Sequence, residues 1–320
     1  AFSFSYNPSR NLPQINRPNG VTTYQGYSPP TGWLTSITST ATAGPLAAAA
    51  NSSYSYSPAK RISAETSEGQ TSSFGYDAAG RLQSQDVNGV TTMYAYDADS
   101  NRCAVNATSC NATFAYNAAD EITASPGVAS YGYDYRGDVT QTATGASIAY
   151  DANDHATQID DGASPLPNIV NNDVAPSGRV LTTAAGPLGL GLSYDTAFGY
   201  DSSSDSPSYT EGLLGSLSIT SYLNGPGGLL AQDTTLLGLL TTSVYPIADA
   251  HGDIVGTTDS SGAFSTNPPT DAFGVGAPTP ASNLGYLGND ERYTTGENLD
   301  LIQMGVRLYY PALGRFLESD

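Results

Sequence analysis

A short phrase recurs along the first half of the chain and constrains its fold more than any other feature. Each copy reads aromatic, small residue, Tyr, Asp or Asn, a few small residues, Gly or Asn, Arg and an aliphatic residue; the cleanest copy runs from Phe74 to Leu82. The Tyr residues of successive copies, which we take as the repeat core, are Tyr6, Tyr56, Tyr76, Tyr96, Tyr116, Tyr133 and Tyr150. From Tyr56 to Tyr116 the step is 20 residues, and the last two steps shorten to 17. A regular period of this length predicts stacked, equivalent units.

Each unit has the properties of one β-hairpin. Side chains alternate along a strand, so the aromatic-x-Tyr pair puts two rings on one face. Asp77 supplies a turn through its own backbone, and Gly80 can take a positive φ. Asn19-Gly20 and Asn88-Gly89 mark the turn at the other end. A single hairpin cannot bury its aromatic face, whereas edge-to-edge stacking covers it. We therefore predict an all-β fold of repeated antiparallel β-hairpins; the alternative is an ordinary sandwich whose strands happen to be similar.

Composition excludes several classes of protein. The 320 residues include 34 Gly and 20 Pro, which disfavours helices, while 39% hydrophobic residues argue against disorder. Eleven basic and 30 acidic residues give a net charge of -19, which excludes nucleic acid as a partner. No apolar run of about 18 residues occurs, so we expect no membrane insertion. No secretory leader pattern opens the chain, which we interpret as a mature product or a piece of something longer.

The repeat phrase resembles the YD repeat of the Rhs family, which also includes shell subunits of Tc toxins and the teneurin ectodomain. Three later stretches strengthen the resemblance: Tyr222 to Gln232, Ala250 to Gly262, and Asp271 to Gly274. The ending is similar to the terminus of the Rhs-repeat-associated core, and its motif residues are Arg307, Tyr309, Tyr310, Pro311, Gly314, Arg315 and Phe316. On this basis we divide the chain into a hairpin array (1–160), a Gly/Pro/Leu-rich irregular connecting segment (161–220) and an Rhs-repeat-associated core (221–320).

The resemblance implies a β-spiral ribbon, a shell or a barrel segment. In bacterial toxins of the family, the shell encloses a toxin that is released by self-cleavage after the core motif. This chain is several-fold shorter than those shells, so we interpret it as a fragment, a subunit of an assembly or a shell-less offshoot. Asp320 matches an Asp implied in the self-cleavage and is the catalytic candidate. Aspartic chemistry needs a second carboxylate, which we expect beyond this residue, so we predict no enzymatic activity in this chain.

Cys103 and Cys110 stand seven residues apart in a stretch rich in Ser, Thr and Asn. This spacing predicts a small disulfide-closed loop and, together with the scarcity of Lys, an exported protein. Two free buried thiols are the alternative. Asn51, Asn106 and Asn111 begin N-glycosylation patterns, so glycans are candidate partners; chance matches in a chain rich in Ser, Thr and Asn are the alternative.

Two further patterns favour structure over chemistry. Asp97, Asp99 and Asn101 have the spacing that opens calcium loops, but Thr108 stands where the twelfth ligand belongs. We therefore predict a hairpin turn here, and no metal or cofactor. His251 precedes Gly-Asp without a nucleophile elbow elsewhere in the sequence, which favours a structural role.

These observations predict a non-enzymatic structural scaffold that lies extracellularly or on the cell surface. We expect this scaffold to associate end to end into a fibre or larger shell, through strand edges near Phe2–Tyr6 and Val306–Tyr310. The alternative function is the C-terminal portion of the encapsulating shell of a polymorphic toxin, with aspartyl autoprocessing just beyond Asp320.

Overall fold

The computed structural model describes residues 1–42, 44–45, 50–67, 69–111, 114–126, 130–142, 145–163, 167–187, 194–212, 217–276, 284–295 and 300–319. The first strands are β1 (Ser3–Ser5), β2 (Gln14–Asn16), β3 (Val21–Tyr27), β4 (Leu34–Ala41), β5 (Gly44–Pro45), β6 (Ser52–Tyr56), β7 (Ile62–Ser67), β8 (Gln70–Tyr76), β9 (Leu82–Val87), β10 (Val90–Tyr96), β11 (Arg102–Val105), β12 (Ala115–Tyr116) and β13 (Ile122–Ala124). The next are β14 (Gly132–Tyr133), β15 (Val139–Gln141), β16 (Ser147–Tyr150), β17 (Ala156–Asp160), β18 (Asn168–Val174), β19 (Val180–Pro187), β20 (Tyr194–Gly199), β21 (Tyr209–Gly212), β22 (Ser218–Gly225), β23 (Gly228–Leu236), β24 (Leu240–Ala248), β25 (Ile254–Thr258) and β26 (Phe264–Thr266). The last elements are η2 (Gly288–Asp290), β27 (Tyr293–Thr295), β28 (Leu301–Met304), β29 (Arg307–Tyr310) and β30 (Arg315–Phe316).

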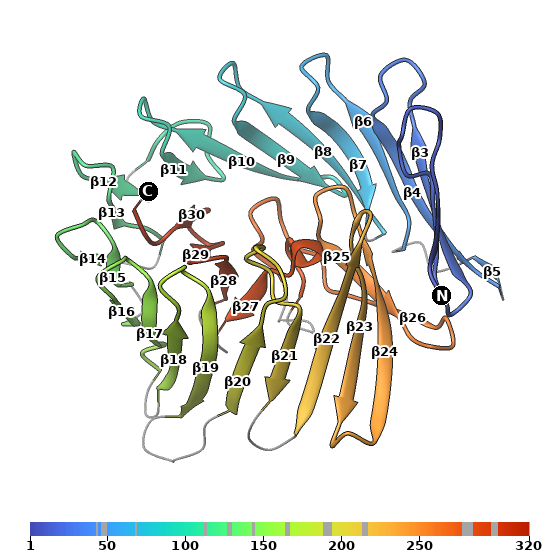
Figure 1. Cartoon of the computed structure of the whole chain (residues 1–320). Coiled ribbons are helices and arrows are strands. Elements are labelled where there is room, and N and C mark those ends of the chain that lie inside the picture. The colour runs from blue at the N-terminus through green and yellow to red at the C-terminus, as the bar shows by residue number, and fades with distance from the viewer. Residues whose placement is uncertain are drawn as a thin grey trace.

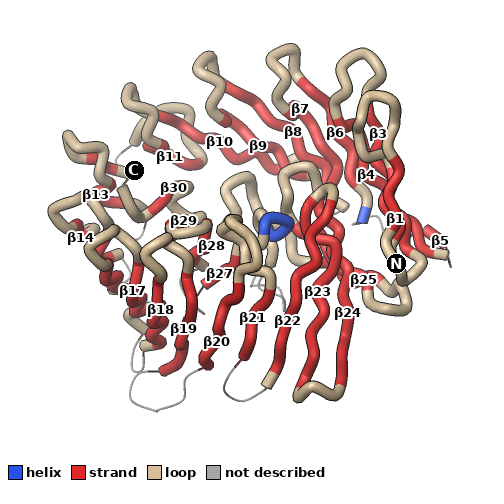
Figure 2. Tube along the Cα trace, in the orientation of Figure 1, coloured by secondary structure: helices blue, strands red, loops and turns tan. Residues whose placement is uncertain are grey.

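Nearly every strand pairs antiparallel with its neighbours in sequence. Over the described residues, β1 to β11 form one sheet of 11 strands, β12 and β13 pair with each other, and β14 to β26 form a sheet of 13 strands. These elements form one curved ribbon of hairpins, which we call the wall (Figure 1). Strands dominate the trace, and helix is confined to short turns (Figure 2). The all-β fold of repeated antiparallel hairpins is therefore confirmed.

The turn of the repeat forms as its residue types predict. In the cleanest copy, the Asp77 N–H donates to the Arg81 carbonyl at 3.0 Å, and Asp77 Oδ1 accepts from the Arg81 N–H at 2.9 Å. Gly80 closes the turn with a φ of 84°. Just before the turn, the strand register shifts between Gly75 and Tyr76, which marks a β-bulge. The same shift precedes Tyr56, Tyr96, Tyr116, Tyr133 and Tyr150.

The bulge affects which ring of a pair lies in the core. Tyr54 and Tyr94, the first aromatics of their copies, are 6% and 3% exposed, whereas Tyr56 and Tyr96 are only partly buried. An extra residue in one strand breaks the simple alternation of sides and re-aims the side chain that follows it. Thus the repeat-core tyrosines predicted from the phrase lie at the margin of the core, and the first aromatic is buried in some copies but only partly buried in others, such as Phe74.

The stretch 161–220, expected to be an irregular connection, instead continues the wall. It contains β18 to β21 and the start of β22, and Asn168 to Val174 pair with residues 180–187 over seven register positions. The expected division at 160/161 therefore lies inside one sheet. These strands carry the repeat phrase only in separate halves, as Gly178-Arg179-Val180 and Phe198-Gly199-Tyr200-Asp201. The two halves meet across β19 and β20: the Tyr200 hydroxyl donates to the Val180 carbonyl at 2.9 Å. The incomplete phrase therefore still belongs to paired strands.

The last strands lie inside the curve of the wall. Strands β27 to β30 form a four-stranded antiparallel sheet, which we call the inner sheet (Figure 1). One buried apolar cluster joins the two parts: Phe114, Ile122, Val139, Ala146, Ile148, Ala156, Ile159 and Val170 from the wall with Leu301, Leu308, Leu313 and Leu317 from the inner sheet and its turns. Since both contribute to one cluster, the inner sheet is part of the fold's main core.

The two ends of the wall meet at a seam. Asn19 Nδ2 donates to Thr258 Oγ1 at 3.0 Å, and the Ala250 N–H donates to the Tyr54 hydroxyl at 2.8 Å. The rings of Phe2 and Tyr245 meet edge to face with centroids 5.9 Å apart. These contacts close the ribbon on itself within a single chain (Figure 1). In the described part of the chain, no helix has both the length and the apolar character needed to cross a membrane.

Candidate functional site

The repeat tyrosines connect successive hairpins through their hydroxyl groups. Each donates to a carbonyl near the start of the return strand of the hairpin before it: Tyr56 to Leu34 (2.6 Å), Tyr76 to Ile62 (2.8 Å), Tyr96 to Leu82 (2.8 Å), Tyr116 to Arg102 (2.9 Å), Tyr133 to Ile122 (2.8 Å) and Tyr150 to Val139 (2.9 Å). Burial raises the pKa of Tyr133 to about 12 and raises the pKa of Tyr76 and Tyr96 as well. The hydroxyls therefore stay protonated and donate at any physiological pH.

Arginines of the repeat lie over the ring of the next copy. The Arg61 guanidinium carbon is 5.5 Å from the centroid of Tyr76, and that of Arg81 is 4.6 Å from Tyr96. Together, the Arg and Tyr of the phrase link each hairpin to the next. Tyr6 departs from this series, because it is 57% exposed. It directly follows β1, the first strand of the wall.

The core-terminus motif forms the inner sheet and its contacts with the wall. Arg307 lies over Phe316 at 3.9 Å, and Arg315 lies over Tyr116 at 5.7 Å and donates to the Asp120 carbonyl at 3.1 Å. Tyr309 donates its hydroxyl to the Phe273 carbonyl at 2.9 Å.

The turn between β29 and β30 uses the remaining motif residues. The Pro311 carbonyl accepts from the Gly314 N–H at 3.0 Å, and Gly314 has a φ of 65°. A Cβ at Gly314 would lie 2.9 Å from the Phe273 ring and 3.0 Å from Arg102. Tyr310, beside this turn, packs against the main core. Every motif residue therefore has a packing role.

Two buried carboxyl groups hold the end of the described chain. Both Glu318 oxygens accept from the Leu308 N–H, at 3.1 and 2.9 Å, and burial raises the pKa of Glu318 to about 7. Asp138 is fully buried; its Oδ1 accepts from the Ser319 N–H at 3.0 Å, and its Oδ2 has no hydrogen-bond partner. Burial also raises the pKa of Asp138. The catalytic candidate Asp320 lies outside the described residues.

His251 lies in a turn that is dense in carboxylates. Asp249 Oδ1 accepts from the N–H groups of His251, Gly252 and Asp253 at 2.9–3.0 Å. His251 Nδ1 lies 2.9 Å from Asp253 Oδ1, and this contact is the main reason that the pKa of His251 is raised. Asp253 Oδ1 also accepts from the Leu287 N–H at 2.7 Å. The arrangement ties the seam to the segment before η2, which is a structural role.

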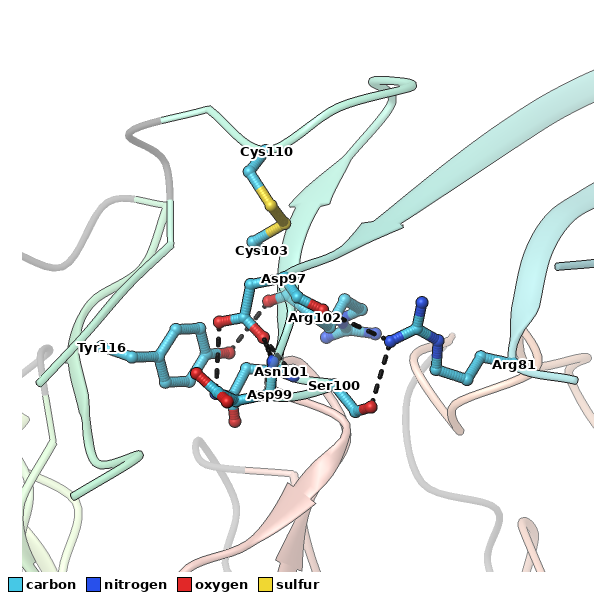
Figure 3. Close-up of a disulfide and its surroundings, with 9 residues drawn as sticks. All are labelled: Arg81, Asp97, Asp99, Ser100, Asn101, Arg102, Cys103, Cys110 and Tyr116. Atoms are coloured by element: carbon cyan, nitrogen blue, oxygen red, sulfur yellow. Dashed lines mark hydrogen bonds between the residues drawn. A yellow bond between two sulfur atoms is a disulfide. The ribbon is translucent and has the colours of Figure 1, made fainter. Parts of the chain in front are cut away.

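Cys103 and Cys110 form a disulfide, with Cα atoms 5.0 Å apart (Figure 3). Cys103 is 3% exposed and packs with Ala95 and Ala104. Next to it, Asp97 Oδ1 accepts from the N–H groups of Asp99 and Asn101 at 3.0 and 2.8 Å, so this pattern is a repeat turn (Figure 3). Among the described residues, no cluster of three or more His, Cys, Asp or Glu could hold a metal ion.

The three sequon asparagines differ in their surroundings. Asn106 and Asn111 are exposed in or next to the disulfide loop, with Asn106 at a φ of 59°. Asn51 is partly buried, and its Oδ1 accepts from the Ser39 N–H at 2.9 Å. A glycan at Asn51 would compete with this contact, whereas the other two side chains are accessible.

The role of Asp138 was missed by sequence reasoning, although a signal was present. In the copy that contains Tyr133, Gly137 is followed by Asp138, where the cleanest copy has Gly80 followed by Arg81. Asp138 therefore stands where other copies have the stacking arginine, and its carboxylate accepts from the Ser319 N–H. Arg17, which is buried at the seam, was also missed, and its position outside the repeat phrase gave no signal.

Comparisons with known proteins agree at the level of the fold. No family model matches the chain, and no curated protein sequence matches it. Among solved structures, the chain is similar to the Tc holotoxin pore of Photorhabdus luminescens (15% identity, TM-score 0.79) and to a TcdB2-TccC3 crystal structure (14% identity, TM-score 0.79). Each match covers 99% of this chain but 18% of the matched one. The chain therefore has the fold of part of a Tc toxin chain and spans less than a fifth of its length.

Proposed function

We propose that the chain is a structural β-repeat scaffold that forms a segment of a toxin-type shell. The observation that carries this proposal is the closure of the wall around an inner sheet with which it shares its main core. The fold likeness to Tc toxin chains supports it. A curved wall that holds its own C-terminal segment is suited to enclosing or anchoring a chain.

The placement of the cations supports a structural function. Of ten arginines, seven lie over aromatic rings: Arg61, Arg81, Arg102, Arg136, Arg179, Arg307 and Arg315. The basic side chains are thus used for stacking, and the surface carries the excess of acidic residues. We therefore do not propose enzymatic activity, and self-processing through Asp320 stays a prediction from the resemblance.

End-to-end assembly is the competing form of a scaffold. The C-terminal edge predicted for it is not an edge, because β29 lies between β28 and β30. At the other end, Phe2 packs against Tyr245 at the seam. In the described part of the chain, β1 pairs only with β2, so its outer backbone edge is still a candidate for pairing with a second copy. Self-association thus stays a prediction. The following experiment distinguishes it from closure within one chain.

The test is a cysteine pair across the seam. In the variant Asn19→Cys/Thr258→Cys, oxidation should give a cross-link within the monomer, because the native side chains touch at 3.0 Å. The single variants Asn19→Cys and Thr258→Cys are the controls, and neither should give a cross-link within the monomer at the seam. Light scattering and electron microscopy of the parent should show compact, curved particles. Cross-linked dimers and multimers, or filaments in the micrographs, would contradict the closed segment and favour the fibre.

We propose in addition that the protein works outside the cytoplasm. The Cys103–Cys110 disulfide supports this, since such bonds persist in oxidising compartments and are rare in the cytosol. Thiol trapping in cells of the native source, followed by mass spectrometry, tests it. Two fully alkylated cysteines would refute the exported location.

A further inference from the structure

A cavity of about 300 Å³ lies at the seam, where the first hairpins meet β23, β24 and η2. Its lining includes Ile15, Ile37, Leu229, Leu230 and Ile247, all of them at most 5% exposed. This volume is at the lower end of the range for small-molecule sites, and such sites are mostly apolar with a few placed polar groups. Its lining also has polar residues, and the guanidinium of Arg17 is the one that is buried and cationic.

Arg17 is buried with most of its hydrogen-bonding capacity unused. It is 7% exposed; Nη1 donates to Thr23 Oγ1 at 2.5 Å and Nη2 donates to the Pro246 carbonyl at 3.0 Å. Its Nε has no partner. A guanidinium has five N–H donors, so two bonds leave three donors over. Burial without a compensating charge lowers the pKa of Arg17 to about 10, so it is still a cation at neutral pH.

Two acids line the same cavity, Asp249 and Asp290, and neither forms an ion pair with Arg17. Asp249 Oδ1 accepts three backbone N–H groups of its own turn. No Asp or Glu among the described residues forms an ion pair with Arg17, whereas Arg292 pairs with Asp205 at 2.9 Å. Nor does Arg17 lie over an aromatic ring, as seven other arginines do.

A purely structural role does not account for this residue. Thr23 and the Pro246 carbonyl could be satisfied by a neutral donor, which would avoid the cost of burying an unpaired charge. The cavity has a mixed lining, in which a buried cation lies among Ile and Leu side chains, and this suits a ligand with two parts. The guanidinium fork matches the two oxygens of a carboxylate, and the Ile and Leu side chains match an aliphatic body. A phosphate would leave those aliphatic side chains without contacts.

We propose that this seam cavity binds a small aliphatic monocarboxylate, with its carboxylate on the Arg17 guanidinium and its body against Ile15, Ile37 and Leu230. The ligand supplies the missing counter-charge and bridges the two ends of the wall, since Arg17 and Ile37 come from the N-terminal hairpins and Leu230 from β23. Occupancy therefore tightens the closure.

The test uses the intact chain and three probes in isothermal titration calorimetry. Sodium 4-methylpentanoate should saturate a single site and raise the melting temperature. The alcohol of the same shape, 4-methyl-1-pentanol, should bind about tenfold to hundredfold more weakly, because it cannot form the charged hydrogen bonds. Inorganic phosphate should not bind. Equal binding of the alcohol, binding of phosphate in place of the carboxylate, or no binding of the carboxylate at millimolar concentration would overturn the proposal.

Two variants remove the site in independent ways. Arg17→Gln should weaken carboxylate binding about tenfold or more, while Leu34→Trp keeps the cation and fills the cavity, which Leu34 lines. If Arg17→Gln does not fold, Leu34→Trp and the comparison with the alcohol decide. Arg179→Gln is the matched control, since Arg179 stacks on Tyr200 and does not line the cavity, and it should bind as the parent does. Unchanged binding in a folded Arg17→Gln or Leu34→Trp variant would refute the assignment.

Discussion

Replacing Tyr76 measures how strongly one hairpin holds the next. Its hydroxyl donates to the Ile62 carbonyl at 2.8 Å, which contributes about 1 kcal/mol to the free energy of unfolding. The Arg61 guanidinium over its ring contributes about 0.5–1 kcal/mol. A partly buried Tyr ring removes about 100 Å² from water, or about 2.5 kcal/mol at 25 cal/mol per Å². We expect Tyr76→Phe to cost about 1 kcal/mol and Tyr76→Ala about 4–4.5 kcal/mol.

The assay is equilibrium unfolding in urea, followed by far-UV circular dichroism and by the fluorescence of the single tryptophan, Trp33. Trp33 lies 5.1 Å from Tyr56 between ring centroids, so it reports on a neighbouring hairpin. If the two probes give the same transition, unfolding is two-state and a single free energy of unfolding describes it. Tyr6→Ala is the matched control, because Tyr6 is 57% exposed and should change stability by less than about 0.5 kcal/mol.

The outcome that refutes this reasoning is a Tyr76→Ala variant as stable as the Tyr6→Ala control. That result would mean that the repeat tyrosines do not support the wall and are available for binding a partner. If Tyr76→Ala lowers the free energy of unfolding but Tyr76→Phe does not, the ring stabilises the wall and the contribution of the hydroxyl contact is refuted.

Three further predictions follow from the turns, the disulfide and the buried acids. Gly80→Ala should cost about 2 kcal/mol or more, because φ is 84° and a Cβ would displace the Arg61 guanidinium from the Tyr76 ring. Gly89→Ala, at a φ of 87° with open space, should cost only the backbone strain of about 1–2 kcal/mol, and equal melting temperatures for the two variants would show that displacing Arg61 costs nothing. Cys103→Ser should lower the free energy of unfolding by at most about 2.5 kcal/mol, since the closed loop is short, and a loss of all cooperative unfolding would contradict this. Burial raises the Glu318 pKa from 4.5 to about 7, so the folded state binds the proton more tightly and stability should fall as pH rises from about 4.5 to 7, by roughly 3 kcal/mol from this group. Glu318→Gln should remove that decline, and identical pH profiles of the melting temperature would show that Glu318 does not titrate in this window.

The sequence was sufficient to predict the local structure of the wall. An Asp that bonds to its own turn and a Gly at positive φ are short-range requirements, so Asp77 and Gly80 specify a hairpin wherever the phrase occurs. The Cys103–Cys110 pairing was also predictable, because the sequence has only two cysteines and they stand close enough to close a small loop.

The longer-range features were not predictable for physical reasons. The bulge before each repeat Tyr depends on how the strand pairs with its neighbour. Because of it, Tyr76 and its equivalents lie at the margin of the core and not inside it, where the simple alternation of a strand had placed them. Strands between 161 and 220 carry only separate halves of the phrase, at 178–180 and 198–201, and their register follows from pairing with neighbours. The seam joins residues more than 200 positions apart, such as Asn19 and Thr258, and no local pattern encodes that contact.

Closure explains how a strongly acidic repeat ribbon can behave as one cooperative unit. In an open array each hairpin contacts only its neighbours, so unfolding can begin at either end and spread. Here the main core joins Phe114 and Val170 of the wall with Leu301 and Leu317, and the seam joins Tyr54 with Ala250. These long-range contacts remove the free ends at which such an array would fray. The Tyr–carbonyl bonds and Arg–ring contacts then hold neighbouring hairpins together. A large number of ion pairs could not do so, because only 11 basic residues face 30 acidic ones.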